Sequence, residues 1–163
     1  MYKRQAANTV DGDELDNSAS NAGAAYVFEH DGSSWSQTTF LKPANMDPSD
    51  KFGSSVAIDG DTIVVGSPAE DGGGTCVNCN PASNGVSSAG AAYVFVRDGS
   101  TWVQQAYLKP SNPGMEDKFG WSVAIDGDTI VVGAHNEDSA ATGINGNGND
   151  NSASNAGAAY VFV

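Results

Sequence analysis

Acidic and amide side chains in two long loops have the spacing of calcium ligands. They stand at the first, third and sixth positions of two six-residue stretches: Asp11, Asp13 and Asp16 in one, and Asn145, Asn147 and Asp150 in the other. Oxygen ligands at alternate positions let a short loop wrap around one Ca²⁺ ion. The alternative, which stays open, is that these side chains only cap the backbone of their own loops. The acidic pairs Glu70-Asp71 and Glu137-Asp138 recur in register, either as further ligands or as surface charge.

The two cysteines of the chain, Cys76 and Cys79, lie in a loop that follows three glycines. Zinc needs four ligands, and this single C-x-x-C has neither a second pair nor a nearby histidine. A redox motif of this spacing would open a helix, and the sequence predicts no helix here. We therefore expect a local disulfide between Cys76 and Cys79, which would suit an extracellular setting.

No catalytic residue is assigned from the sequence. The two histidines, His30 and His135, have no recurring serine or cysteine partner, and the motifs G-x-S-x-G and H-E-x-x-H are absent. Trp35 and Trp102 are expected to be packing anchors, with sugar stacking as the alternative if their rings are exposed. Trp121 stands where an earlier copy of the same segment has a serine, so it has no counterpart.

The charge of the chain excludes two classes of partner. Seven lysines and arginines stand against twenty aspartates and glutamates among 163 residues, so the net charge is −13. Nucleic-acid binding requires basic stripes, which this chain lacks, and an anionic membrane surface would repel it. No apolar run approaches the roughly 20 residues of a membrane-spanning helix. We expect neither nucleic-acid binding nor membrane insertion.

Two sequence markers repeat in one register along the chain. The heptamer AGAAYVF occupies residues 22–28, 89–95 and 156–162, at intervals of 67 residues. A longer marker, KFG followed after one residue by SVAIDGDTIVVG, occupies residues 51–66 and 118–133, again 67 apart. The chain therefore consists of one supersecondary unit used about two and a half times.

Each unit is predicted to contain four short antiparallel strands. Residues 55–58 and 62–65 are β-branched runs joined by Asp59-Gly60-Asp61, and Asp-Gly between two such runs indicates a tight hairpin. Residues 91–96 and 102–108 form a second predicted hairpin. Four short strands per unit favour an all-β fold, a β-propeller fragment of about two and a half blades. A parallel β-helix is the competing fold, but its coils are usually shorter.

The residues around these hairpins resemble the FG-GAP repeat of integrin α-subunit head domains and of bacterial propellers. The residues that carry the resemblance are Phe52, Gly53, Gly66, Ser67 and Pro68 in one copy, and Phe119, Gly120, Gly133 and Ala134 in the next. The resemblance implies a seven-bladed propeller. It also implies a calcium loop between the two strands after Phe-Gly, but residues 58–62 and 125–129 have too few carboxylates for six ligands. Asp59 and Asp61 are interpreted as turn residues.

The repeat boundaries divide the chain into four parts. Residues 1–5 match no part of the repeat and are predicted to be non-native sequence, and residues 6–51 end a preceding blade. Residues 52–110 form one complete blade, and residues 111–163 begin the following blade, which is truncated. A seven-bladed ring needs far more than 163 residues, so we expect a fragment of a longer protein that self-associates when alone, because its terminal blades lack neighbours.

The sequence favours a non-catalytic binding, adhesion or scaffolding module of a secreted or cell-surface propeller. Its Asn-, Asp- and Gly-rich loops would present a surface to a protein or glycan ligand, and its acidity suits an extracellular setting. The alternative is an accessory or platform propeller of a larger extracellular hydrolase or lyase, with catalytic residues outside residues 1–163. A shared fold does not by itself decide between these functions.

Overall fold

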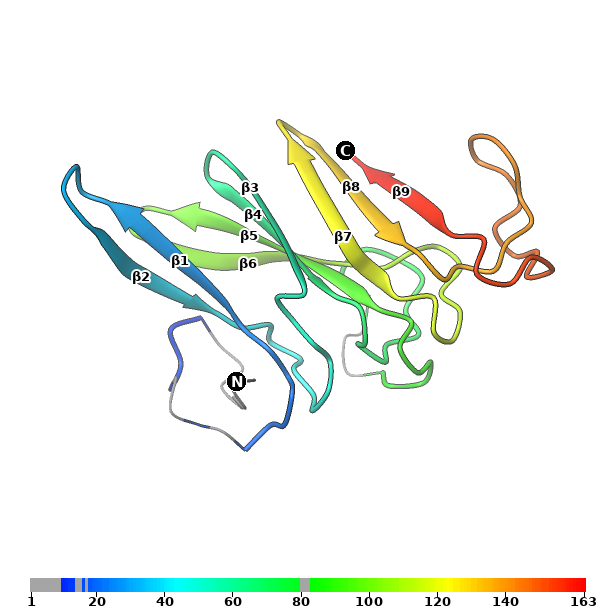
Figure 1. The fold of residues 1–163 in the computed structure, drawn as a ribbon, viewed down its shortest axis with the longest axis horizontal. Helices are drawn as coiled ribbons and strands as arrows, with labels where there is room; N and C mark the ends of the chain where they lie inside the picture. The colour runs from blue at the N-terminus through cyan, green and yellow to red at the C-terminus, as the bar shows by residue number, and fades with distance from the viewer. Residues whose placement is uncertain (1–9, 14–15, 17, 80–82) are drawn as a thin grey trace.

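The chain folds into three small antiparallel sheets that stand side by side (Figure 1). The computed structural model describes residues 10–13, 16, 18–79 and 83–163. The first sheet pairs two strands, the second four and the third three, each in chain order. The strands are β1 Ala25–His30, β2 Trp35–Leu41, β3 Ser55–Asp59, β4 Thr62–Ser67, β5 Ala91–Asp98, β6 Thr101–Leu108, β7 Phe119–Asp126, β8 Thr129–Ala134 and β9 Ala158–Phe162. This confirms the prediction of an all-β fold built from propeller blades.

The predicted hairpins form around the Asp-Gly turns. Asp59 pairs with Thr62 across β3 and β4, which leaves a loop of two residues. Gly60 begins this loop with φ of 52°, in the left-handed region that glycine adopts without strain. Gly127 repeats the turn between β7 and β8 with φ of 54°. The described residues contain no helix. No helix in this part of the chain is therefore long and apolar enough to cross a bilayer.

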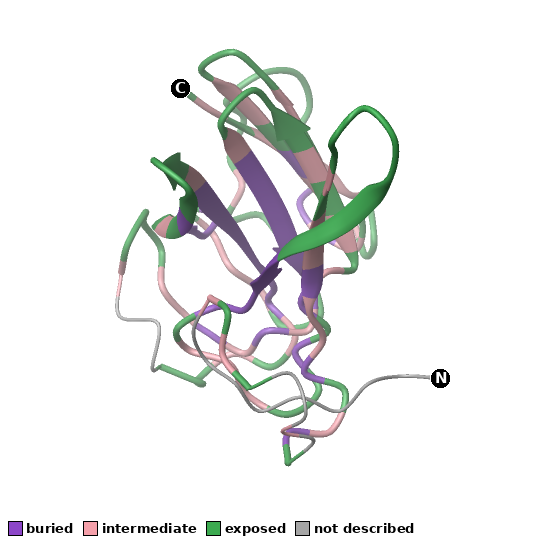
Figure 2. Cartoon of the chain, turned by 90° about the vertical axis from the view of Figure 1, so that its left-hand side faces the viewer, coloured by how far each residue is buried: buried purple, intermediate pink, exposed green. Residues whose placement is uncertain are grey.

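The core lies between the sheets, and β4 and β5 supply most of it. One face of these strands packs towards β1 and β2, with Tyr93 and Phe95 fully buried. The opposite face packs against the third sheet, where Val64 and Val94 meet Phe119. Figure 2 shows the exposed segments at the hairpin tips, and the buried ones lie towards the opposite ends of β2, β4 and β5. Burial on both faces explains why β4 and β5 are continuous apolar runs instead of alternating ones.

Neighbouring sheets approach through backbone contacts that we call the Phe-Gly joint. Gly90, which precedes β5, pairs in a parallel bridge with Phe119, and Gly23 pairs in the same way with Phe52. A Cβ at Gly90 would lie 2.1 Å from the carbonyl oxygen of Phe119. A Cβ at Gly120 would lie 2.1 Å from the carbonyl oxygen of Ala91. Only glycine fits on either side of this contact, which gives the repeated Phe-Gly motif a structural reason.

Replacing Gly120 by alanine should destabilise the chain by about 3 kcal/mol or more, because a new Cβ meets backbone atoms at a position with φ of 87°. Gly127→Ala is the matched control, because Gly127 also has positive φ but has no atom within 4 Å of its Cβ position. We expect this control to cost only about 1 kcal/mol. Thermal or urea unfolding measures both variants. Equal destabilisation by the two would mean that the close contact adds nothing to the cost of positive φ.

Apolar side chains remain exposed on two sheet faces. Val56 and Ile58 on β3 are each 61% exposed. They pair with Val65 and Ile63, so they lie on the face of the second sheet that looks towards the two-stranded first sheet, where no described residue covers them. Val161 on β9, in the third sheet, is 65% exposed, whereas Val94, its equivalent one repeat earlier, is buried between two sheets. Both exposed faces therefore have the composition of a blade interface.

We expect the isolated chain to self-associate through these exposed apolar faces. Replacing Val56 and Ile58 together by threonine, a good strand former, should lower the oligomeric fraction because the exposed apolar area falls. Light scattering after size exclusion over a hundredfold range of protein concentration measures the change. A wild-type chain that stays a monodisperse monomer over this range would contradict the prediction.

Candidate functional site

The first predicted calcium loop uses two of its carboxylates as caps for backbone groups. Oδ1 of Asp11 accepts a hydrogen bond from the Phe40 amide at 2.7 Å, and the Asp11 amide donates to the Phe40 carbonyl. Oδ1 of Asp16 accepts from the Ser18 amide at 3.0 Å, and this bond lowers the pKa of Asp16. The Asp13 carbonyl accepts from the Asp16 amide, so the stretch turns back on itself. The loop is thereby tied to the edge of β2.

The second predicted loop has the same kind of local bonding. Oδ1 of Asn147 accepts from the Asn149 amide at 3.2 Å, and Oδ1 of Asp150 accepts from the Ser152 amide at 3.2 Å. Asn145 has φ of 55°, a conformation that asparagine tolerates better than most residues. Within the described residues, no three histidine, cysteine, aspartate or glutamate side chains are grouped so that they could hold a metal ion. Calcium binding at Asp11, Asp13, Asp16, Asn145, Asn147 and Asp150 stays a prediction.

The two cysteines are joined in a disulfide in the loop between β4 and β5. Their Cα atoms lie 5.5 Å apart, within the usual range for such a bond. The neighbouring Asn78 anchors this loop to β6, because its amide donates to the Tyr107 carbonyl and its side-chain oxygen accepts from the Tyr107 amide. The disulfide therefore closes a turn that already has a fixed place beside the sheet.

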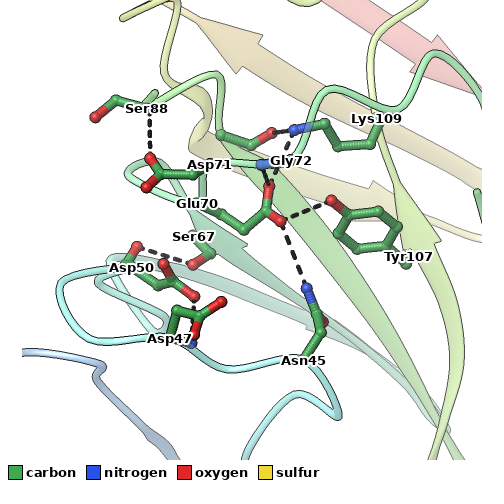
Figure 3. Close-up of polar contacts among 11 residues, drawn as sticks. Asn45, Asp47, Asp50, Ser67, Glu70, Asp71, Gly72, Ser88, Tyr107 and Lys109 are labelled. Carbon is green, nitrogen blue, oxygen red and sulfur yellow. Dashed lines mark hydrogen bonds and ion pairs between the residues drawn. The ribbon is translucent and has the colours of Figure 1, made fainter. Parts of the chain in front are cut away.

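A buried ion pair lies beneath the loops that connect the blades (Figure 3). Nζ of Lys109 and Oε2 of Glu70 are 3.0 Å apart, and both side chains are almost completely buried. The hydroxyl of Tyr107 donates to Oε1 of Glu70 at 2.8 Å, and the Gly72 amide donates to Oε2 at 3.0 Å. Nζ of Lys109 also donates to the carbonyl of Gly90. Each charge is thus satisfied by several partners, as burial requires.

The other copies of the repeat each build part of this arrangement. Glu137 stands one period after Glu70 and is equally buried, and it accepts from the Asn112 side chain at 2.9 Å and from the Ser139 amide. Lys42, one period before Lys109, is buried and donates to the Gly23 carbonyl. The interpretation of Glu70 and Glu137 as surface charge is therefore wrong, and their alternative role as further metal ligands stays a prediction. Their recurrence in register was the signal, but recurrence alone does not tell burial from exposure.

The aspartates that follow these glutamates have a different role. Oδ1 of Asp71 accepts from the Ser88 amide at 2.7 Å, and Oδ1 of Asp138 accepts from the Asn155 amide at 2.7 Å. Ser88 and Asn155 both have positive φ and lie just before the AGAAYVF strands. Asp71 and Asp138 therefore hold the entry to each of these strands.

Asp50 is the most perturbed carboxyl of this region. Burial raises its pKa to about 7, and the nearby charge of Glu70 raises it further, against a hydrogen bond from the Asp47 amide that lowers it. The Asp50 carbonyl accepts from the Ser67 hydroxyl at 2.9 Å, which ties this loop to the end of β4. Burial also lowers the pKa of Lys42 to about 8.

The stability of the chain should fall as the pH rises from 5 to about 7.5. The folded state holds a proton on Asp50 up to a pKa of about 7, whereas the unfolded state releases it near 3.8, so this contribution is lost as the pH rises through 7. Asp50→Asn, which mimics the protonated carboxyl, should reduce the fall in melting temperature by roughly 2–5 °C. Asp98→Asn on an exposed turn is the control. Parallel profiles for wild type and Asp50→Asn would show that Asp50 does not titrate in this way.

A groove of about 860 Å³ lies at the Phe-Gly ends of the blades. Two successive Phe-Gly turns form its walls, so equivalent loops of neighbouring blades face the same space. We call it the Phe-Gly groove, and it is lined by Asn21, Lys51, Phe52, Gly53, Ser54, Pro68, Ala69, Ser88, Glu116, Lys118 and Trp121. Figure 1 places these long connections at the end of the strands opposite the short hairpin turns.

Trp121 is the large exposed apolar side chain of this groove. Its indole is 52% exposed and packs on the imidazole of His135, with ring centroids 4.1 Å apart and planes tilted by 34°. Trp35 also packs on a histidine, His30, at 5.1 Å, but it lies on β2 away from the groove. Trp102 is buried, as expected for a packing anchor, whereas Trp35 is 70% exposed. Exposure of Trp35 therefore differs from the expectation, because no described residue covers its outer side.

A family model described as the FG-GAP repeat matches residues 35–95 and 102–162. The two matches start one repeat period apart, at Trp35 and Trp102, and each ends at the phenylalanine of an AGAAYVF strand. Together they cover most of the chain. No curated protein matches the chain.

Proposed function

We propose that this chain, which belongs to the FG-GAP repeat family, is a non-catalytic binding module of an extracellular β-propeller, with the Phe-Gly groove as its ligand-binding surface. The observation that carries this proposal is a groove of about 860 Å³ with a half-exposed indole, Trp121, on its wall. A concave surface with one aromatic anchor and several polar groups is the usual form of a ligand site.

Three further features support a binding role outside the cell. The FG-GAP fold is a propeller-type scaffold whose rigid sheets carry variable loops at their ends. The Cys76–Cys79 disulfide is stable in an oxidising compartment and unusual in a reducing one. Both histidines pack on tryptophans, which is consistent with a role in ring packing. The ligand of such a module is a protein or a glycan.

Trp121→Ser tests the binding role of the groove. Serine is the residue at the equivalent position of the preceding blade, Ser54, so the repeat itself accommodates it. We expect labelled wild-type chain to bind at least one ligand on combined glycan and peptide arrays, and Trp121→Ser to lose about tenfold in affinity for that ligand.

Trp35→Ser is the matched control, because Trp35 is also exposed and also packs on a histidine but lies outside the groove. This variant should bind like wild type, and circular dichroism should show that both variants are folded. Binding that Trp121→Ser leaves unchanged, or no binding to either array, would contradict the assignment of the groove.

A further inference from the structure

The Phe-Gly groove collects the exposed lysines of an otherwise acidic chain. Of the five described lysines and arginines, Lys42 and Lys109 are buried, and Arg97 pairs with Glu29 at 2.6 Å. The remaining two, Lys51 and Lys118, both line the groove. Against a net charge of −13, this concentration of positive charge is a local property of the groove.

The two lysines occupy the same position in successive repeats but differ in their surroundings. Nζ of Lys118 lies 3.7 Å from a carboxylate oxygen of Glu116, so its charge is partly balanced. The equivalent of Glu116 beside Lys51 is Ser49, and Lys51 forms no ion pair with any described residue. Lys51 is therefore the cation that a bound anion would meet.

The position of Trp121 gives the groove a flat apolar surface beside this cation. His135 packs against the indole ring and fixes its orientation, and about half of the ring surface remains accessible. The Trp121 amide donates to the Lys118 carbonyl at 3.1 Å, which holds the backbone of the turn. An exposed indole held in this way is a platform on which a planar or ring-shaped ligand can stack.

The rest of the lining favours a ligand rich in hydroxyl groups. Asn21, Ser54 and Ser88 contribute short polar side chains beside Pro68 and Ala69, whereas Phe52 is almost completely buried. A peptide that binds by apolar side chains needs further apolar pockets, and a peptide that adds a strand needs a free sheet edge. The groove is walled by turns whose backbone groups are engaged, with the Ser54 amide donating to the Lys51 carbonyl at 3.2 Å.

We propose that the Phe-Gly groove binds an acidic glycan, with a sugar ring stacked on Trp121 and a carboxylate of a uronic acid residue paired with Lys51. This inference rests on the proposed binding function and adds the ligand class. It accounts for the aromatic platform, the unpaired cation and the polar lining together.

The test uses uronate hexasaccharides of three different linkages, with neutral cellohexaose as the uncharged comparison. Isothermal titration calorimetry of the wild-type chain should detect at least one uronate ligand, with affinity that falls as NaCl is raised from 50 to 500 mM. Cellohexaose should bind at least threefold more weakly, because it cannot pair with Lys51.

Two matched pairs of variants separate stacking from charge. Trp121→Ser should weaken uronate binding by about tenfold and Trp35→Ser by less than twofold. Lys51→Gln should weaken it about two- to fivefold, as expected for an exposed ion pair, and should not affect cellohexaose. Arg97→Gln makes the same change in net charge outside the groove and should bind like wild type.

The outcomes distinguish this inference from the proposed function on which it rests. Equal binding of cellohexaose and uronates, or uronate binding that Trp121→Ser and Lys51→Gln leave unchanged, overturns the acidic-glycan inference. So does the absence of binding to all three uronates. If in that case an array peptide binds and Trp121→Ser loses it, the groove remains a binding site for a protein ligand. If no array ligand depends on Trp121, the proposed function fails as well.

Discussion

Close backbone contact between neighbouring blades is the constraint on which the rest of the structure depends. At the Phe-Gly joint, Gly90 and Gly120 lie on opposite sides of one contact, and a Cβ on either would lie 2.1 Å from a carbonyl oxygen, which leaves no room for a side chain. Both have positive φ, which glycine adopts at little cost. The distance between sheets is thus set by main-chain atoms, and the aromatic core forms around it, with Phe119 packed edge-on against Tyr160 and Phe162. A contact of this kind cannot shift by one residue, which explains why both sequence markers keep the 67-residue register.

The buried Glu70–Lys109 pair acts on the same joint. Lys109 donates to the carbonyl of Gly90, the glycine whose backbone bridges to Phe119 of the next blade. Burial of the pair gives little net stability, because desolvation offsets most of the attraction, but removal of one partner costs about 3–5 kcal/mol. The pair therefore specifies one arrangement of the loop more than it strengthens the fold. Lys42 donates to the carbonyl of Gly23 in the same way, so two successive joint glycines are held by a buried lysine.

The sequence predicts those parts of the structure that depend on local chemistry. The Asp-Gly hairpins follow from the positive φ of Gly60 and Gly127, and the strands follow from their β-branched runs. The burial of Glu70 is not predictable in the same way. Its partner Lys109 lies 39 residues further along the chain, and the sequence around a loop glutamate does not show whether such a distant lysine binds it. The groove cannot be predicted from the sequence either, because its lining comes from several loops that only the packing of the blades brings together. Local spacing also could not predict that Asp11 caps the backbone of β2, because Phe40 lies 29 residues further along the chain.

Comparison of the repeats with one another separates scaffold from binding surface. Positions that build the joint are the same in each copy, as Phe52 and Phe119 show. Positions that line the groove differ: Ser54 becomes Trp121, and Ser49 becomes Glu116 beside the shared lysine. The joint tolerates no side chain, whereas the groove wall accepts either a serine or an indole at one position without a change in the backbone hydrogen bond of the turn. Phe52 and Gly53 belong to both the joint and the groove, whereas the next side chain, Ser54 in one blade and Trp121 in the following one, is free to change. The lining of the groove can therefore vary from blade to blade while the glycines that set the distance between the blades stay constant.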